Sequence, residues 1–242
     1  MISLYYHDNN ASLAPHLLLR EIGVDFKLEF VDRSGNAQKS SEFLALNPLG
    51  KIPVLVCGDT AIFESAAICM HLCELHPTAN LSPAVGHPKR PIFMQWLMYL
   101  TNTLQADLMI YCYPQRYCGT VSDPATKFTT AGGDIELADF LEVAATNLKL
   151  CVEMRVTDML IFLNEQLQGG TDGTDDADYY YLVDNNITAC DYYLFMLLLW
   201  TENFARPPVT FLNLRRFMQN MSTRSAVKQT CEIEHIDITK YE

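Results

Sequence analysis

The sequence lacks a paired-cysteine motif, although it contains eight cysteines among its 242 residues. No Cys-x-x-Cys pair occurs, and no group of cysteines and histidines has the spacing of a zinc site. Without such a pair the chain has no dithiol chemistry of the thioredoxin kind. We interpret most cysteines as reduced core residues, expect a reducing, cytoplasmic compartment, and predict no metal.

An excess of basic residues is also missing. The 17 Lys and Arg residues are outnumbered by 29 Asp and Glu residues, so the formal net charge is −12. Nucleic-acid binding requires a basic surface that faces the phosphates, and anionic membranes attract basic segments. The sequence therefore predicts neither nucleic acid nor membrane as a partner.

Long apolar runs are absent as well. The residues from Met1 to Tyr6 show no basic stretch followed by an apolar run, so we expect no secretory signal. The most apolar stretch, 192–200, is far shorter than the roughly 20 residues that span a bilayer. The aspartates of 168–178 lack the ligand order of an EF-hand, which favours a solvated turn: Asp172, Asp175, Asp176 and Asp178.

The first part of the chain alternates between strand and helix patterns. A β-prone run at 2–6 precedes a helix that Ser12 can cap and Gly23 ends, and a strand follows at 26–31. Further on, the pattern predicts a helical turn at 40–46 and a hairpin of two strands at 54–57 and 61–63. A helix follows at 65–76. This order predicts an α/β layer that contains a parallel strand pair.

The rest of the chain is predicted to be helical. Apolar periodicity favours helices over 94–108, 152–167, 188–203, 212–220 and 223–233. The polar segment 117–133 is expected to be a loop or a mobile insertion. We therefore predict an α/β domain over 1–78, a proline-rich linker over 79–90 and an all-helical domain over 91–242.

Several motifs, in matching order, resemble glutathione transferases, most closely the bacterial beta class. The matching runs are 4–6, 12–16, 19–23, 43–48, 50–55, 63–65 with 67–68, and 187–192. The last run resembles a capping motif in which Asp191 reaches back to Thr188. The resemblance implies a thioredoxin-like domain followed by an all-helical domain, a homodimer, and a role in detoxification with glutathione and a small hydrophobic electrophile as ligands.

The resemblance also implies where glutathione binds. It places the γ-glutamyl end of the peptide at Glu64 and Ser65, where the start of a helix favours an anion. The alternative is that Ser65 only caps the helix and binds no ligand. Lys51 can meet the glycyl carboxylate as a point charge, and Arg33 or Lys39 can add a second charge.

The family holds the equivalent of the Ile52–Pro53 bond in the cis form. We expect this turn to expose the backbone of Val54, which can then pair with the cysteinyl part of the peptide like an added strand. The run 108–113 can line the electrophile site between the domains or form plain helix core, and the sequence does not decide between these.

Two departures from the beta-class pattern affect the chemistry. Ala11 stands where those enzymes usually carry a cysteine, so no mixed disulfide with glutathione can form there. Gln105 replaces a family histidine. A transferase then needs another group to stabilise the thiolate, and the candidates are Asn10, Ser12 and Tyr6.

Two functions follow from these residues. The first is a glutathione transferase that conjugates the thiolate to small electrophiles or reduces peroxides. The alternative is a non-catalytic glutathione-fold protein that binds a ligand or a partner, which Ala11 and Gln105 favour. Substituting Asn10 and Ser12 singly by alanine would separate them.

Overall fold

The first part of the chain forms a four-stranded sheet in the order β2-β1-β3-β4. The computed structural model describes residues 1–119, 127–130, 133–167, 181–183 and 186–241. Strand β1 (Ile2–Tyr6) pairs in parallel with β2 (Phe26–Phe30) and antiparallel with β3 (Val54–Cys57), which pairs antiparallel with β4 (Thr60–Phe63). The parallel pair requires a crossover, which α1 (Leu13–Ile22) supplies.

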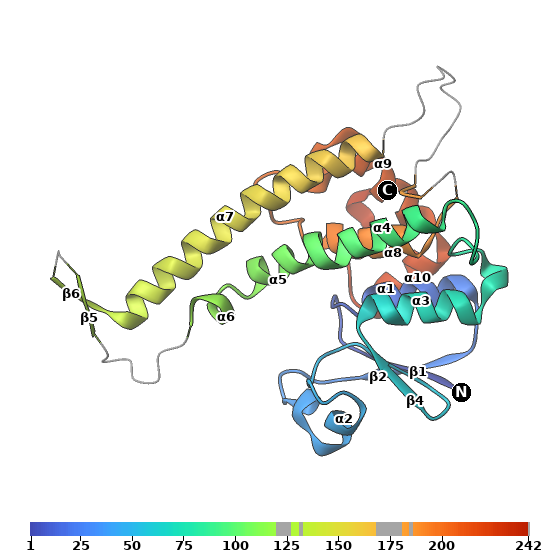
Figure 1. The fold of residues 1–242 in the computed structure, drawn as a ribbon, viewed down its shortest axis with the longest axis horizontal. Helices are drawn as coiled ribbons and strands as arrows, with labels where there is room; N and C mark the ends of the chain where they lie inside the picture. Colours follow the sequence, from blue (N-terminus) through green and yellow to red (C-terminus); the bar gives the residue numbers. More distant parts are fainter. Residues whose placement is uncertain (120–126, 131–132, 168–180, 184–185, 242) are drawn as a thin grey trace.

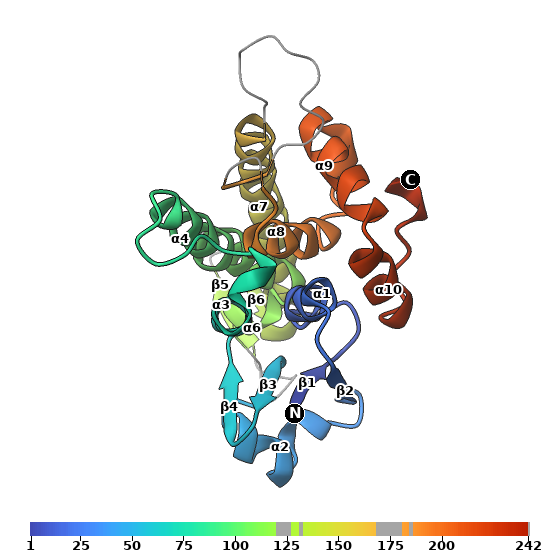
Figure 2. The ribbon, with the colours of Figure 1, turned by 90° about the vertical axis from the view of Figure 1, so that its right-hand side faces the viewer.

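Helices cover both faces of this sheet. Helices α1 and α3 (Ser65–Leu75) lie between the sheet and the rest of the protein, and α2 (Ser41–Leu46) lies on the far side (Figures 1 and 2). As predicted, Gly23 ends α1 in the left-handed region, with φ 77°. Short 3-10 turns at Ala37–Lys39 and Pro77–Ala79 precede α2 and follow α3. The sheet and its helices form the predicted thioredoxin-like arrangement.

The second part of the chain is helical. It begins with one continuous helical rod made of α4 (Arg90–Tyr99), the π-helical segment η3 (Leu100–Gln105) and α5 (Ala106–Cys112). The remaining elements are α6 (Gln115–Cys118), α7 (Leu137–Gln166), α8 (Ala189–Leu199), η4 (Pro208–Thr210), α9 (Leu212–Thr223), α10 (Ser225–Ile233) and η5 (Thr239–Tyr241). The predicted fold class is confirmed.

Helix α8 forms the centre of the core. All of its residues are buried, because its side chains are apolar around the whole circumference. The predicted capping motif is present: the Asp191 carboxylate accepts from the Thr188 N–H (2.7 Å) and from the Leu182 N–H (2.9 Å). Burial raises the pKa of Asp191 to about 6 despite these bonds. The helix packs against α1, and thus joins the two parts of the molecule.

Two predictions about the middle of the chain need correction. Helix α7 begins at Leu137, about four turns before the predicted start at residue 152, and projects from the body alongside α5 (Figure 1). The segment 117–133, predicted as a loop or a mobile insertion, contains the end of α6 and strand β5 (Lys127–Thr130), which pairs with β6 (Gly133–Glu136). The aspartates of 168–178 lie outside the described residues. Within the described residues, no helix combines the length and apolarity that crossing a membrane requires.

Candidate functional site

A buried asparagine organises the loop that leads into β3. Asn47 is 2% exposed, its amide nitrogen donates to the Lys51 carbonyl (2.7 Å), and its Oδ1 accepts from the Leu49 N–H (3.1 Å). The Ile52–Pro53 bond that follows is cis, as predicted. Among the described residues, none forms a hydrogen bond with the N–H or C=O of Ile52. Ile52 therefore presents an open donor and acceptor just before the strand.

Val54 lies inside the sheet. It pairs with Tyr5 of β1 on one side and with Phe63 of β4 on the other, and it is fully buried. The structure corrects the expectation that the turn exposes the backbone of Val54, because neighbouring strands cover both of its sides. The residue with an open backbone is Ile52, which is only partly buried.

The start of α3 lies beside this loop in the fold. Glu64 precedes the helix with φ 72° and ψ 112°, a combination that non-glycine residues rarely adopt, and its side chain is exposed. Such conformations concentrate at functional sites. Ser65 is 6% exposed and is the first residue of α3, whose N-terminal N–H groups carry partial positive charge. The Glu64 side chain makes no capping hydrogen bond, and Ser65 is the first helical residue and not the cap residue of α3.

A tyrosine from the helical part reaches the same helix terminus. The hydroxyl of Tyr193, on α8, donates to Oε1 of Gln105 (2.6 Å), and Ser65 lies at the same hydroxyl. Burial raises the pKa of Tyr193, which therefore stays protonated and able to donate. Gln105 ends the π-helical segment η3, and such wide turns frequently occur at functional sites. Thus Gln105 holds a hydrogen bond where the family carries a histidine.

The loop between β1 and α1 carries the two predicted catalytic residues. The Ser12 hydroxyl donates to the His7 carbonyl (3.1 Å) and accepts from the His7 N–H (3.3 Å), and Ser12 is completely buried. The predicted side-chain cap is therefore wrong: Ser12 ties down the loop instead. Asn10 is partly exposed, and its Oδ1 accepts from the Ala11 N–H (2.8 Å). That bond orients the amide, and no described residue accepts from its nitrogen.

Tyr6 points toward α1. Its ring lies 6.0 Å from that of His16 and 5.6 Å from that of Phe30. Burial raises its pKa, and the carboxylates of Asp8 and Glu234 raise it further. An acidic environment disfavours a second negative charge, so Tyr6 is a poorer thiolate partner than Asn10.

A buried acid that directly follows α10 holds the same loop. The Oε1 of Glu234 lies 2.7 Å from Nδ1 of His16, and its Oε2 accepts from the Asn9 N–H (3.1 Å). Burial raises the pKa of Glu234 to about 8 and lowers that of His16 to about 3. The contact between Glu234 and Asn9 could not be predicted from the sequence, because no local pattern indicates a contact between residues 225 positions apart.

Two of the three predicted cations, Lys39 and Lys51, lie at the loop before β3, and Arg33 does not. Lys51 is exposed, and Lys39 donates to the Leu49 carbonyl (3.4 Å). Arg33 turns to the helical part, where its Nη2 donates to the Tyr113 hydroxyl (3.2 Å). Of the three, Lys51 lies next to the open backbone of Ile52.

The run 108–113 has mixed roles. Leu108 is fully buried core, and the Tyr111 ring faces Phe204, 4.5 Å away on another part of the helical region. Tyr113 meets Arg33 of the first domain. The core interpretation therefore holds for the start of the run, and its last residue contacts the other domain.

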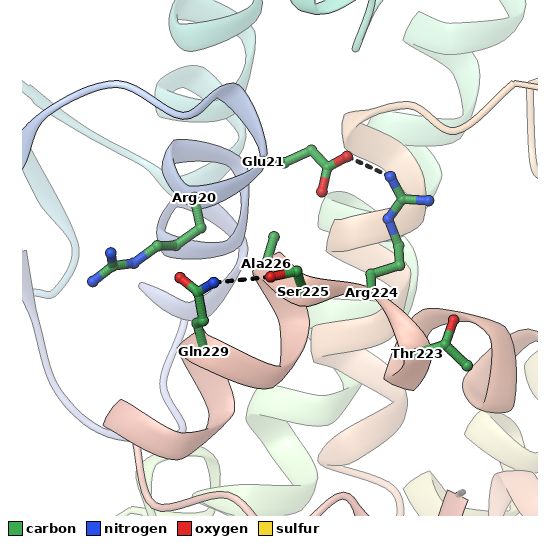
Figure 3. Close-up of a pocket in the computed structure, with 7 residues that line it drawn as sticks. All are labelled: Arg20, Glu21, Thr223, Arg224, Ser225, Ala226 and Gln229. Carbon is green, nitrogen blue, oxygen red and sulfur yellow. Dashed lines mark hydrogen bonds and ion pairs between the residues drawn. The ribbon is translucent and has the colours of Figure 1, made fainter.

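A cavity of about 510 Å³ opens at the far end of α1, between that helix and the start of α10 (Figure 3). Arg224 forms an ion pair with Glu21 and donates to the Tyr192 hydroxyl (2.9 Å), while Gln229 donates to Ser225 (2.9 Å). None of the predicted site residues lines this cavity. Elsewhere in the described chain, no three His, Cys, Asp or Glu side chains converge as metal ligands.

These features define a two-domain class of protein. Its first domain has a thioredoxin-like sheet with a cis proline, an open backbone before that proline and a helix terminus beside it, and its second domain is helical. Family models named "Glutathione S-transferase, N-terminal domain" and "Glutathione S-transferase, C-terminal domain" match residues 2–74 and 147–225. The chain belongs to the glutathione transferase family.

Individual relatives agree with this assignment. Glutathione S-transferase GstA of Escherichia coli is 24% identical over 96% of this chain and 98% of its own length. Glutathione S-transferase 3 of Zea mays is 44% identical over 28% of this chain and 32% of its own length. A Sulfitobacter glutathione transferase homologue, solved with bound glutathione, shares the fold with TM-score 0.75, 18% identity, and coverage of 96% and 98%. A beta-class enzyme of Sphingomonas chungbukensis gives TM-score 0.67, 23% identity, and coverage of 97% and 100%.

Proposed function

We propose that this protein is a cytoplasmic transferase that binds glutathione and conjugates its thiolate to small electrophiles in detoxification. The observation that carries the proposal is the open backbone of Ile52 before the cis-Pro53 bond, in a domain whose α3 begins with Ser65. An extended peptide needs a free N–H and C=O to pair with, and its carboxylate needs a positively polarised terminus.

Each part of the tripeptide has a partner in this proposal. The cysteinyl backbone pairs with Ile52, and the γ-glutamyl carboxylate accepts from the N–H and hydroxyl of Ser65. The exposed carboxylate of Glu64 receives the γ-glutamyl amine, and Lys51 meets the glycyl carboxylate. Val54 supports this set indirectly, because its pairing within the sheet fixes the strand that follows Pro53.

The chemistry requires a thiolate near neutral pH. A free thiol has a pKa of about 8.5, and each unit of depression corresponds to about 1.4 kcal/mol. One hydrogen bond to a charged acceptor contributes about 1.5–3 kcal/mol, enough to lower the thiol pKa by one to two units. We assign that donor to the Asn10 amide, because the Ser12 hydroxyl already donates to the His7 carbonyl and accepts from the His7 N–H.

The thiol proton leaves to solvent and the thiolate forms a bond to the electrophilic carbon. Either a leaving group departs with the electron pair of its own bond, or that pair moves to a conjugated oxygen, which then takes a proton from solvent. With a peroxide, the thiolate takes the terminal oxygen and releases an alcohol. A second glutathione then condenses with the sulfenic acid to give a disulfide and water.

We also propose that a second copy of the chain covers the outer face of α7. Exposed apolar side chains follow a heptad pattern there, with Val143 59%, Leu150 57%, Met154 71% and Ile161 37% exposed. They lie opposite the buried face of the same helix, which carries Ala145, Val152, Val156, Leu160 and Leu163. Asn147 occupies an inner heptad position, where a polar residue fixes the register of a helix pair. Such a face favours a homodimer.

The second candidate is a non-catalytic glutathione-binding protein. Two observations favour it: Ala11 provides no thiol, and the Ser12 hydroxyl is buried in bonds to the backbone. Both candidates share the peptide site, so a turnover assay with Asn10→Ala separates them once binding is established.

Calorimetry with glutathione at neutral pH tests the peptide site. We expect micromolar to millimolar binding, weakened about tenfold or more by Ser65→Ala and by Glu64→Gln, each of which loses a charge-assisted contact. Ser225→Ala is the matched control, since Ser225 is also the first residue of a helix but lies on α10. Absence of binding at several millimolar glutathione would refute the proposal.

A further inference from the structure

Two arginines and a tyrosine form a cluster between the domains. Nη2 of Arg33 donates to the Tyr113 hydroxyl (3.2 Å), and the Arg33 guanidinium carbon lies 5.9 Å from the centre of that ring. The guanidinium carbon of Arg116 lies 3.9 Å from the same centre. Arg33 follows β2 in the first domain, whereas Tyr113 and Arg116 follow α5 in the second.

The cluster lies near the loop that carries Asn10. The Val31 carbonyl oxygen lies 3.0 Å from Nδ1 of His7 and accepts a hydrogen bond when that nitrogen carries the proton. The Val31 N–H donates to the Tyr6 carbonyl (2.9 Å). Arg33 is two residues further on, which is about 7 Å of extended chain. The cluster and the Asn10 loop therefore leave the same edge of the sheet, at the carboxyl ends of the parallel strands, where ligands of such sheets bind.

Neither arginine forms an ion pair with any described carboxylate. The nearest acid in sequence is Asp32, whose Oδ1 accepts from the N–H (2.9 Å) and hydroxyl (2.6 Å) of Ser34. In a chain of net charge −12, two guanidinium groups on one ring that no described carboxylate pairs with are a local exception. Guanidinium groups bind carboxylates through paired N–H donors, and the ring offers a flat surface for a planar ligand.

We propose that Arg33, Tyr113 and Arg116 select electrophiles that carry a carboxylate on a planar, aromatic body. This inference rests on the proposed transferase function and names the class of its second substrate. The carboxylate accepts from Arg116 and Arg33, and the Tyr113 hydroxyl, which accepts from Arg33, can donate its own proton to the same oxygen. The reactive carbon then points toward the Asn10 loop.

The glycyl carboxylate of glutathione is the other anion that could meet these arginines. Lys51 adjoins the open backbone of Ile52, whereas Arg116 belongs to the helical domain, so we assign the cluster to the second substrate. An experiment that compares glutathione itself with its S-substituted forms distinguishes the glycyl carboxylate from a carboxylate of the second substrate.

The test measures binding of three ligands by calorimetry: glutathione, S-(4-carboxybenzyl)glutathione and S-(4-carbamoylbenzyl)glutathione. The last two differ only in the charge of the distal group. We expect the acid to bind about three- to tenfold more tightly than the amide at low salt, and less so at high salt, as for a partly exposed ion pair. Arg116→Gln and Arg33→Gln should abolish this preference.

Lys149→Gln is the matched control. Lys149 lies 4.5 Å from the centre of a different ring, that of Tyr111, so its replacement removes one nearby positive charge without touching the cluster. It should keep the preference for the acid. Equal binding of acid and amide by the wild type, or equal loss in the Lys149 variant, overturns the inference while the transferase stands.

A loss of affinity for plain glutathione in Arg116→Gln, as large as the loss for the acid, assigns the arginines to the glycyl carboxylate and also overturns it. If none of the three ligands binds, the proposed function itself fails. Turnover of 4-chloro-3-nitrobenzoate and its carboxamide provides a kinetic check, with the ratio of the two kcat/KM values following the same pattern across the variants.

Discussion

Replacing Glu234 by glutamine should change how stability depends on pH. In the wild type, the buried carboxyl of Glu234 lies 2.7 Å from His16, and burial raises its pKa from 4.5 to about 8. The same burial, with a smaller effect of Arg20, lowers the pKa of His16 from 6.5 to about 3. Asp8 also faces Glu234 and raises its pKa further. The folded pair therefore keeps one proton at neutral pH.

The sign of the effect follows from proton counting. Between pH 4.5 and 8 the folded protein holds a proton on Glu234 that the unfolded chain has lost, so stability falls as pH rises. Between pH 3 and 6.5 the unfolded chain holds a proton on His16 that the folded protein lacks, so stability rises with pH. Below pH 4.5 only His16 acts, and between pH 4.5 and 6.5 the two effects oppose each other and largely cancel. Above pH 6.5 only Glu234 acts, at up to about 1.4 kcal/mol per pH unit, or about 2 kcal/mol by pH 8.

Glutamine keeps the shape and the hydrogen bonds but has no proton to lose. In Glu234→Gln the fall between pH 6.5 and 8 should disappear. Stability should also rise between pH 4.5 and 6.5, where the wild type is nearly flat, because the His16 effect is no longer opposed. Urea unfolding followed by circular dichroism, at fixed protein concentration across this pH range, measures both. Glu232→Gln, a change at an exposed residue two positions earlier in α10, should reproduce the wild-type profile. A fall between pH 6.5 and 8 that persists in Glu234→Gln would show that this reasoning is wrong.

Three further changes test other parts of the structure. Asn10→Ala should raise the thiol pKa of bound glutathione by one to two units and lower kcat/KM at neutral pH by about ten- to a hundredfold. The ultraviolet absorbance of the thiolate measures the first effect and steady-state kinetics the second. An unchanged thiol pKa would contradict the assignment of Asn10. Met154→Glu should dissociate the proposed dimer in sedimentation, whereas the exposed Asp158→Asn should not, and a monomeric wild type would refute that interface. Alkylation of the native protein should modify Cys112 and Cys151, whose side chains are exposed, and spare the buried Cys69, Cys73, Cys190 and Cys231. Burial raises the pKa of Cys112 as well, so Cys112 should react only at alkaline pH. Mass spectrometry of the peptides identifies the modified residues.

Local patterns were enough to predict the elements of the first domain and α8. Gly23 ends α1, Gly58 turns the hairpin at φ 60°, and Asp191 caps α8, because each depends on residues close in sequence. Helix α7 was harder to delimit. Its first half carries exposed Val143 and Leu150 opposite the buried Ala145, and apolar side chains on two faces blur the period on which the prediction relies.

The structural elements around the candidate site were predictable from the sequence, whereas the atoms that these elements leave open were not. The Ile52–Pro53 turn and the start of α3 could be placed from sequence, but sheet register decides that Ile52, not Val54, has the open backbone. The role of Ser12 likewise depends on the position of the His7 backbone, five residues away in an irregular loop. Such details depend on tertiary geometry, which hydrophobic periodicity does not contain.

The hydrogen bond from Asn9 to Glu234 joins residues 225 positions apart, and this has a consequence for biosynthesis. A ribosome adds about 5–20 residues per second, so roughly 10–45 s pass between the emergence of the first loop and that of its anchor. During this interval the nascent thioredoxin-like domain can form its sheet, but the loop that carries Asn10 is not yet held. Newly made chains should therefore acquire any ligand-binding competence of this loop only after Glu234 has left the exit tunnel, long after the proposed peptide site was made.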